Sequence, residues 1–459
     1  MSRDDGKLLA TAMGAATAGA ALAVMAMKMI DGSKDQSGKG GGESAYNNSG
    51  GSVLAYHQGD KRPVRTSVIM NDPSDLHESI SHGSMNMKRE ASDAMLFPHN
   101  HEEKMRRRIA TRYTIEEENN LGRDSVTVRV PATSANVGPG YDCIGIAVDL
   151  WSEVTVSRVP NGDTVGFEIT AEGEGAEAMP KDESNYLVVG CKAAFETANK
   201  PLPPLKYHVV SRIPYARGLG SSSAAIVAGI VAGLVLAGHR LPCWGSEALL
   251  QIAAGIEGHP DNVAPVIYGG IQLGIHNGTR WLTERISNPP GLQCIIFIPD
   301  FIGKTSDARG VLDNTVTREE AAFNIGRAAF LVHAFETNNL DNLRWGVQDK
   351  LHQPQRGGKL YKYLYPMIEA AEKAGACCAY LSGAGPTVMA LTSGAAGDIF
   401  AQREKERTDI LVAKAMIQCA KDHGVDGKLL VTNVVSEGCR VTHVDPPFST
   451  GEITYRDNI

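Results

Sequence analysis

Paired cysteines are the feature that this sequence most clearly lacks. Eight cysteines occur in 459 residues, at positions 143, 191, 243, 294, 377, 378, 419 and 439, and none forms a C-x-x-C pair. Structural zinc sites use such pairs, and disulfide frameworks belong to short secreted chains. The pattern argues against both and favours a reducing compartment, either the cytoplasm or an organelle such as a plastid.

A strong excess of one charge is also missing. The net charge is −7, and 21% of the residues are charged. This balance gives no reason to expect nucleic-acid binding. The one basic run, residues 104–108, is short and follows Glu102 and Glu103, so we interpret it as solvated surface. The length allows two or three domains, and a hydrophobic content of 42% is that of an ordinary globular protein.

One long uncharged run stands out near the N-terminus, residues 8–27 (LLATAMGAATAGAALAVMAM). Its length is close to the roughly 20 residues of a membrane span, but its Ala and Gly make it weakly hydrophobic. Asp4 and Asp5 weaken the positive flank of a targeting signal. We expect an anchor or targeting segment, with a surface helix or a disordered segment as alternatives. A Gly-, Ser- and Asn-rich linker follows, so we expect little order in the extension 1–124.

A folded domain begins at Ser125. Val126, Val128 and Val130 alternate with polar residues, which is the period of a strand. Further strands are predicted in WSEVTVSRV, GFEITAEG and LKYHVVSRI, and helices over 186–198, 224–237 and 246–256. From about residue 292 we expect a second unit with the strand QCIIFIPD, helices over 318–338 and 361–373, and two strands in CCAYLSGAGPTVMAL. Interleaved strands and helices predict an α+β or α/β protein with domains 125–291 and 292–459.

The sharpest signal is a loop between a strand and an apolar helix, here called the Gly/Ser loop (residues 214–224). Glycines allow the backbone to approach a polyphosphate, and the N–H groups and dipole of the first helical turn attract it. Serine hydroxyls can donate to phosphate oxygens or ligate magnesium. An ordinary turn capping a core helix is the alternative, but three serines in this context favour a phosphate site. No Lys follows the second glycine, so this is not the common P-loop.

The Gly/Ser loop, PYARGLGSSSA, resembles the phosphate-binding motif of the GHMP kinases. Two more motifs of that family stand in the expected order, VPATSANVGPGYD before the loop at 130–142 and LSGAGPTV after it at 381–388. The resemblance implies an α+β protein with an N-terminal domain of the ribosomal-protein-S5 type and a ferredoxin-like C-terminal domain. It implies an active site between them, ATP as phosphoryl donor with Mg²⁺, and a homodimer.

Four stretches resemble the homoserine kinases within this family. They are the motif at 130–142, IEGHPDNVAP at 256–265, KTSDAR at 304–309 and DKLHQPQR at 349–356, and the resemblance covers about 125 to 445. The implied reaction is phosphorylation of the L-homoserine hydroxyl by ATP, a step of threonine biosynthesis. Two alternatives stay open: another GHMP small-molecule kinase of the mevalonate type, and a catalytically inactive metabolite sensor.

An amino-acid substrate needs partners for its carboxylate and its ammonium. Arg309 and Arg356 suit the carboxylate because Arg binds it bidentately. Asp142 can hold the ammonium, with the neutral Asn136 beside it; for any one of these residues a surface ion pair is the alternative. The resemblance implies that three further residues line the homoserine pocket: His259, Asp261 and Thr305. For His259 the alternative is a structural histidine.

The remaining roles also come from the resemblance. Ser222 and Glu257 would ligate magnesium, with Ser221 or Ser223 as alternatives to Ser222, and Asn185 would contact the adenosine part of ATP. Asn262 has a neutral amide that cannot accept the hydroxyl proton, so we predict no side-chain base and a catalytic set of Asn262, Glu257 and Ser222. The predicted ATP loop comprises Pro214, Arg217, Gly218, Leu219, Gly220, Ser221, Ser222, Ser223 and Ala224.

Overall fold

The computed structural model describes residues 123–160, 167–238, 245–393 and 408–447, all within one compact unit. The extension before residue 123, with the apolar run 8–27, lies outside the described residues. Arg123, the first described residue, is already in contact with the folded unit. Its Nη1 donates to the carbonyl oxygens of Pro446 and Pro447, each at 2.8 Å. None of the helices in the described part of the chain combines the length and apolarity of a membrane span.

The first sheet is built on a long hairpin of β1 (Ser125–Ala135) and β2 (Ile144–Arg158). The alternating valines at 126, 128 and 130 are buried, which confirms the predicted strand. The strand order is β11-β1-β2-β4-β3, and β5 pairs with both β2 and β6. Only the β3–β4 pair is parallel among these strands. The other strands are β3 (Phe167–Gly173), β4 (Leu205–Ser211), β5 (Ile271–His276), β6 (Trp281–Ile286) and β11 (Arg440–Asp445).

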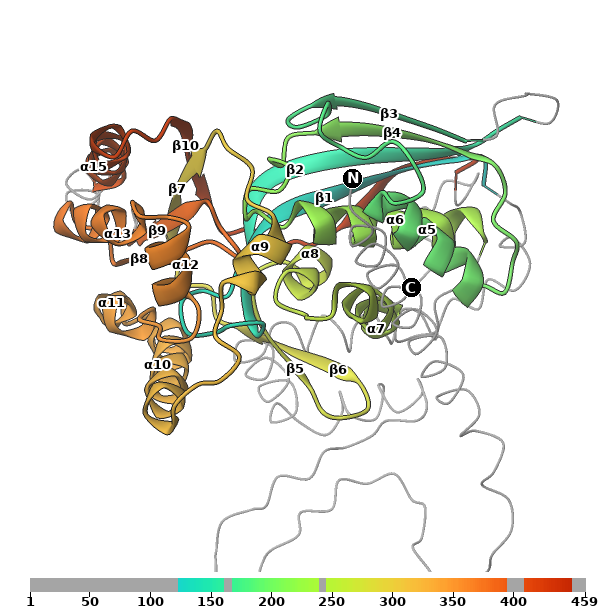
Figure 1. Ribbon diagram of the computed structural model, residues 1–459. Coiled ribbons are helices and arrows are strands. Elements are labelled where there is room, and N and C mark those ends of the chain that lie inside the picture. The colour runs from blue at the N-terminus through green and yellow to red at the C-terminus, as the bar shows by residue number, and fades with distance from the viewer. Residues whose placement is uncertain (1–122, 161–166, 239–244, 394–407, 448–459) are drawn as a thin grey trace, which may run out of the picture. The chain divides into compact units, whose positions relative to one another are not determined.

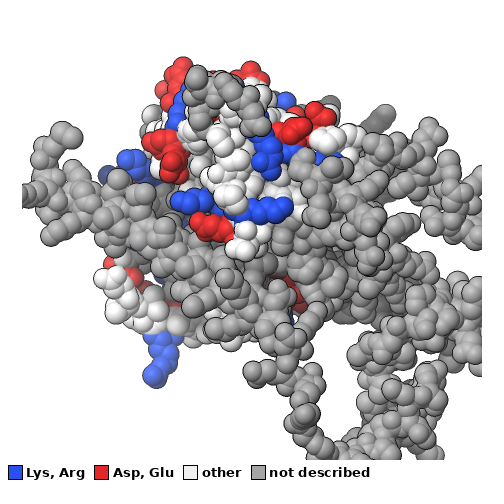
Figure 2. All heavy atoms as spheres, turned by 90° about the vertical axis from the view of Figure 1, so that its right-hand side faces the viewer, with Lys and Arg blue, Asp and Glu red and all other residues white. Residues whose placement is uncertain are grey.

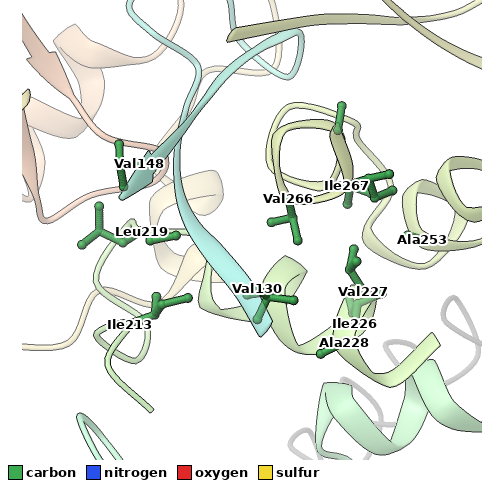
Figure 3. Close-up of a cluster of buried hydrophobic side chains, with 14 of the residues drawn as sticks. Val130, Val148, Ile213, Leu219, Ile226, Val227, Ala228, Ala253, Val266 and Ile267 are labelled. Carbon is green, nitrogen blue, oxygen red and sulfur yellow. The ribbon is translucent and has the colours of Figure 1, made fainter. Parts of the chain in front are cut away.

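Four helices lie against this sheet (Figure 1): α5 (Tyr186–Thr197), α6 (Ser221–Leu236), α7 (Gly245–Glu257) and α8 (Val263–Tyr268). The apolar helix α6 is central and packs on α5 and β1. A Cβ on Gly229 of α6 would lie 2.1 Å from the carbonyl oxygen of Leu187 in α5. The glycine therefore lets the two helices touch. Figure 3 shows side chains of β1, α6, α7 and α8 meeting in one core.

The second sheet has the order β10-β7-β9-β8 and is antiparallel throughout. With its helices it gives the β-α-β-β-α-β arrangement of a ferredoxin-like domain, as predicted, and the α+β class is confirmed. Its strands are β7 (Gln293–Pro299), β8 (Cys378–Leu381), β9 (Val388–Thr392) and β10 (Gly427–Asn433). Its helices are α9 (Thr305–Gly310), α10 (Arg318–Glu336), the 3₁₀ helix η2 (Leu340–Asn342), α11 (Leu343–Gly346), α12 (Gln353–Lys359), α13 (Leu364–Lys373) and α15 (Thr408–Asp422).

The last described strand returns to the first sheet. β11 pairs with β1, where Val444 lies opposite Val126. A strand from the segment after residue 292 thus completes the first sheet, and the domain bounds 125–291 and 292–459 stay predictions. Pairing of this kind follows from tertiary contacts and not from the local sequence.

Charges of both signs are interspersed on the described part of the face in Figure 2. Arg280 and Glu247, in the first turn of α7, form an ion pair at 2.6 Å with side chains 48% and 28% exposed. Exposed pairs of this kind contribute little to stability.

Candidate active site

The Gly/Ser loop follows β4 and leads into α6. Gly220, the N-cap of α6, has φ 69° and ψ 27°, and Gly218 has φ 81°, both in the left-handed region. A Cβ on Gly220 would lie 1.9 Å from Oγ1 of Thr133, and one on Gly218 would lie 2.4 Å from the carbonyl oxygen of Ser382. Only glycine fits both positions. No side chain caps α6, so its first N–H groups can receive an anion.

The three serines of the loop have different surroundings. Oγ of Ser221 accepts a hydrogen bond from the amide of Ala216 at 3.2 Å. Oγ of Ser222 donates to Oε1 of Glu257 at 2.9 Å. Ser223 is fully buried, and its hydroxyl has no hydrogen-bond partner among the described residues. Ser222 is therefore the serine that the fold places beside Glu257.

Other loop residues point elsewhere. Nη2 of Arg217 donates to the carbonyl oxygen of Asp300 at 2.7 Å. Leu219 is fully buried, and Figure 3 shows it beside Val148 and Ile213 in the core. Pro214, Arg217, Leu219 and Ser223 lie outside the lining of the pocket described next, so their contact with ATP stays a prediction.

A pocket of about 610 Å³ opens beside the loop, lined from both domains. It gathers most of the predicted site residues. From the Gly/Ser loop, the start of α5 and the end of α7 these are Asn185, Gly218, Gly220, Ser221, Ser222, Ala224 and Glu257. The others are Asn136, Asp142, His259, Asp261, Asn262, Thr305, Arg309 and Arg356. Lys304, which the predicted site did not include, also lines it.

The loop after β1 joins the two domains. Asn136 and Asp142 have positive φ values of 68° and 56°, a strained conformation that concentrates at functional sites. Oδ1 of Asn136 accepts from the amide of Asp142 at 3.0 Å, and Nδ2 donates to the carbonyl oxygen of Gly383 at 2.8 Å. The first and third motifs are thus bonded to each other through Asn136.

The predicted ammonium and carboxylate partners contact each other. Nη2 of Arg309 donates to Oδ1 of Asp142 at 2.8 Å, and Nη1 donates to Oδ2 at 3.2 Å. The side chains are 40% and 31% exposed, so the pair can meet a substrate. Opposite charges held side by side match the two charged groups of an α-amino acid.

Arg356 is almost fully buried, with 2% exposed. Its Nε donates to the carbonyl oxygen of Ala308 at 3.1 Å, and its Nη1 to that of Gly383 at 3.1 Å. Nη1 also lies 3.0 Å from Nδ1 of His352, whose Nε2 lies 2.8 Å from the carbonyl oxygen of Gly138. Burial lowers the pKa of His352. We therefore assign a neutral ring that accepts at Nδ1 and donates at Nε2.

Asp349 holds the start of α12, which carries Arg356. Its carboxylate accepts from the amides of His352 at 2.9 Å and Gln353 at 2.7 Å, and from Nδ2 of Asn324 at 2.7 Å. Sequence reasoning gave Asp349 no role. Asp349 lies four residues before α12, which has a Pro within its first two positions, and an Asp just upstream of such a helix start is the signal that could have indicated this role.

His259 and Asp261 form a close pair, with Nδ1 and Oδ1 2.5 Å apart. Burial by itself lowers the pKa of His259, but the Asp261 carboxylate more than reverses this and raises that pKa to about 9. Their ligand atoms and those of Asp142 lie within 4.8 Å of one another. Because its pKa is raised, the His259 ring carries its proton at neutral pH and does not serve as a proton acceptor.

Asn262 is held by a residue that the predicted site omitted. Oγ1 of Thr133 donates to Oδ1 of Asn262 at 2.8 Å, and Thr133 is fully buried. This bond occupies the carbonyl end of the amide and directs the NH₂ end to other partners. Thr133 lies in the motif at 130–142, but its partner is 129 residues away.

Asn185 caps α5. Its Oδ1 accepts from the amide of Leu187 at 2.9 Å, and its Nδ2 donates to the carbonyl oxygen of Pro180 at 2.7 Å. Both ends of this amide thus serve the fold at the edge of the pocket. Its contact with adenosine stays a prediction.

Comparisons with known proteins agree with this geometry. The family description "GHMP kinases N terminal domain" matches residues 185–270, and "GHMP kinases C terminal" matches 331–407. A homoserine kinase of Desulfitobacterium hafniense is 36% identical over 316 residues, which is 69% of this chain and 99% of the relative. A homoserine kinase of Synechocystis sp. is 37% identical over 318 residues, 69% of this chain and 98% of the relative. The crystal structure of homoserine kinase from Cytophaga hutchinsonii is similar with a TM-score of 0.60 and 28% identity, over 70% of this chain and 98% of that one.

Proposed function

This chain belongs to the homoserine kinases of the GHMP kinase family, and from that premise we propose that it transfers the γ-phosphoryl group of ATP to the hydroxyl of L-homoserine. The products are ADP and O-phospho-L-homoserine, on the route to threonine. One observation carries the proposal: a single pocket joins the Gly/Ser loop to Asp142, Arg309 and Arg356. The proposed phosphate site and the proposed zwitterion site thus share one space.

The phosphates of ATP are proposed to lie on the Gly/Ser loop at the start of α6. This helix runs for 16 residues, long enough for its dipole and free N–H groups to stabilise negative charge at that end. Gly218 and Gly220 take the positive φ that this loop requires, where an added Cβ would clash with Ser382 and Thr133.

Magnesium is proposed to bind at Ser222 and Glu257. The pair fits this ion, because a hydroxyl and a carboxylate oxygen 2.9 Å apart both line the pocket beside the loop. Both are the hard oxygen ligands that magnesium prefers. When bound, the ion neutralises charge on the phosphate oxygens during transfer.

The amino-acid end of homoserine is proposed to bind where Asp142, Arg309 and Arg356 converge. Its ammonium would contact the carboxylate of Asp142, and its carboxylate the guanidiniums. Asp261 and His259 lie near Asp142, with ligand atoms of the three within 4.8 Å of one another, and Thr305 lines the same pocket at the start of α9. Binding the remote end of the substrate positions its hydroxyl for transfer.

The reaction is proposed to proceed without a side-chain base. Asn262 is neutral, and His259 keeps its proton at neutral pH because its pKa is raised to about 9. The hydroxyl proton then passes to an oxygen of the transferred phosphoryl group. Phosphoryl transfer is accelerated mainly by alignment and charge neutralisation, which Asn262, held by Thr133 at 2.8 Å, can supply.

An ADP-release assay tests the proposal. Homoserine, mevalonate and shikimate are offered separately with ATP and magnesium, and homoserine should give the highest kcat/KM. A higher value for mevalonate would contradict the substrate, and no ADP release with any alcohol would favour a sensor. The homodimer, the roles of residues 8–27 and the domain bounds 125–291 and 292–459 stay predictions.

A further inference from the structure

Tyr141 contacts both arginines of the proposed carboxylate site. The centroid of its ring is 5.6 Å from the guanidinium carbon of Arg309 and 5.6 Å from that of Arg356. Its hydroxyl oxygen accepts a hydrogen bond from Nη1 of Arg309 at 2.8 Å. Tyr141 itself lies outside the lining of the pocket. It therefore contacts the arginines without lining the pocket.

The two arginines need such a partner. Two guanidiniums that converge on one carboxylate repel each other while the carboxylate is absent. An aromatic ring attracts cations through the negative charge of its faces. Burial raises the pKa of Tyr141, so its hydroxyl stays neutral and can accept from Arg309. One side chain thus contacts both cations.

The hydrogen bonds of Arg309 show which of its edges remains for a substrate. Nη1 donates to the Tyr141 hydroxyl and to Oδ2 of Asp142, and Nη2 donates to Oδ1 of Asp142. A guanidinium has five N–H donors. The Nε–H and the second hydrogen of Nη2 have no hydrogen-bond partner among the described residues. These two donors form the side edge of the guanidinium, which matches a carboxylate bidentately.

Arg356 is restricted in a similar way. Its Nε donates to Ala308, and its Nη1 is engaged by Gly383 and His352. Within the described parts of the chain, Nη2 has no partner and is the end left for a ligand. The ring of His352 lies 5.4 Å from that of Tyr141. The same small cluster therefore orients both guanidiniums.

We propose that Tyr141 is the positioning residue of this carboxylate clamp. By accepting from Nη1 of Arg309 and placing its ring near both guanidiniums, it presents the side edge of Arg309 and Nη2 of Arg356 to one carboxylate. The inference rests on the proposed function, since homoserine supplies that carboxylate. Ordinary packing of an aromatic residue is the competing explanation, and it predicts no dependence on the substrate carboxylate.

The test compares Tyr141→Phe and Tyr141→Leu with the unaltered protein on two substrates, homoserine and 3-amino-1-propanol, which lacks only the carboxylate. Tyr141→Phe removes the acceptor and should lower kcat/KM for homoserine about tenfold, as expected for a hydrogen bond to a charged group. Tyr141→Leu also removes the ring and should lower it about 100-fold. Both should act mainly on KM, and kcat/KM for 3-amino-1-propanol and the KM for ATP should change less than threefold.

A double-mutant cycle separates positioning from packing. If the hydroxyl acts through Arg309, Tyr141→Phe should have less than a twofold further effect in an Arg309→Ala background. Tyr207→Phe is the matched control, because it also removes a buried hydroxyl, one that contacts Cys191 in the core. Its kcat/KM values should equal those of the unaltered protein. Thermal unfolding of each variant verifies that the fold is kept, and the conservative Tyr141→Phe carries the test if Tyr141→Leu does not fold.

The outcomes distinguish the two proposals. Equal losses on both substrates, or full additivity with Arg309→Ala, would overturn the role of Tyr141 while leaving the kinase activity in place. Normal homoserine kinetics in Tyr141→Phe would do the same. An unaltered protein that does not phosphorylate homoserine would overturn the proposed function and this inference with it.

Discussion

Glu257→Gln is the change that most directly tests the proposed catalytic set. Glutamine has nearly the same volume as glutamate and keeps an oxygen that can accept from Ser222, as Oε1 of Glu257 does at 2.9 Å. The substitution therefore removes one negative charge and little else. The residue ends α7 and is followed by Gly258, where even an added Cβ would meet nothing within 4 Å. We expect no loss of folding.

The expected loss is electrostatic. Removing one oxyanion-hole donor typically costs about 2.7–4 kcal/mol, or 10²–10³ in kcat, and we expect a charge-stabilising group in phosphoryl transfer to be worth a similar amount. We expect kcat to fall at least about 10²-fold, and the magnesium concentration for half-maximal activity to rise. Binding of ATP without magnesium, measured by calorimetry, should stay nearly unchanged because the loop amides are intact.

Glu247→Gln provides the control on the same helix. Glu247 lies in the first turn of α7, pairs with Arg280 at 2.6 Å and does not line the pocket. ADP release by this variant should stay within about twofold of the unaltered protein. If Glu257→Gln behaves like Glu247→Gln, then Glu257 is structural and the magnesium assignment is refuted.

Three further predictions concern the substrate ends and the cluster between the domains. Asp142→Ala should raise the KM for homoserine strongly, because the substrate ammonium loses its partner at a cost of roughly 2–5 kcal/mol, and it should raise the KM for ATP far less. Equal rises in both KM values would mean that Asp142 maintains the fold. Gly220→Ala should impair ATP binding, because its Cβ would lie 1.9 Å from Oγ1 of Thr133. The control Gly326→Ala, with open space around the added Cβ, should leave the kinetics unchanged. Matching kinetics in the two variants would contradict the loop geometry. His352→Leu should reduce the free energy of unfolding by about 1–3 kcal/mol, since it leaves buried partners unsatisfied. The folded pKa of His352 lies below its unfolded value of 6.5, so its neutral form contributes stability above that pH, which is lost as the pH falls through this range. Denaturant unfolding between pH 7 and pH 5 should therefore show a smaller pH dependence in His352→Leu, and an unchanged slope would refute the neutral assignment.

Much of the fold was predictable because its elements have strong local signals. The helices α5, α6, α7, α10 and α13 lie within three residues of their predicted bounds. Alternating valines identified β1, and the apolar composition of α6 identified a buried helix. The hairpin β5–β6 was missed because TERI in β6 is polar and only its last residue, Ile286, is buried. Such a strand is stabilised by its neighbour and carries little periodic signal of its own.

The chemical identity of the site was set by the sequence alone. The glycines, the loop serines and the charged residues each belong to short stretches whose residue types match phosphate, metal and zwitterion binding. The tertiary structure decided which of these groups act on one another. Arg309 meets Asp142 across 167 residues, Thr133 meets Asn262 across 129, and Asn136 meets Gly383 across 247. These partners are joined by the packing of two domains, and hydrogen bonds between distant segments leave no period or spacing in the chain. That is why Thr133, Asp349 and Tyr141, which orient the groups facing the pocket, became visible only in the folded protein.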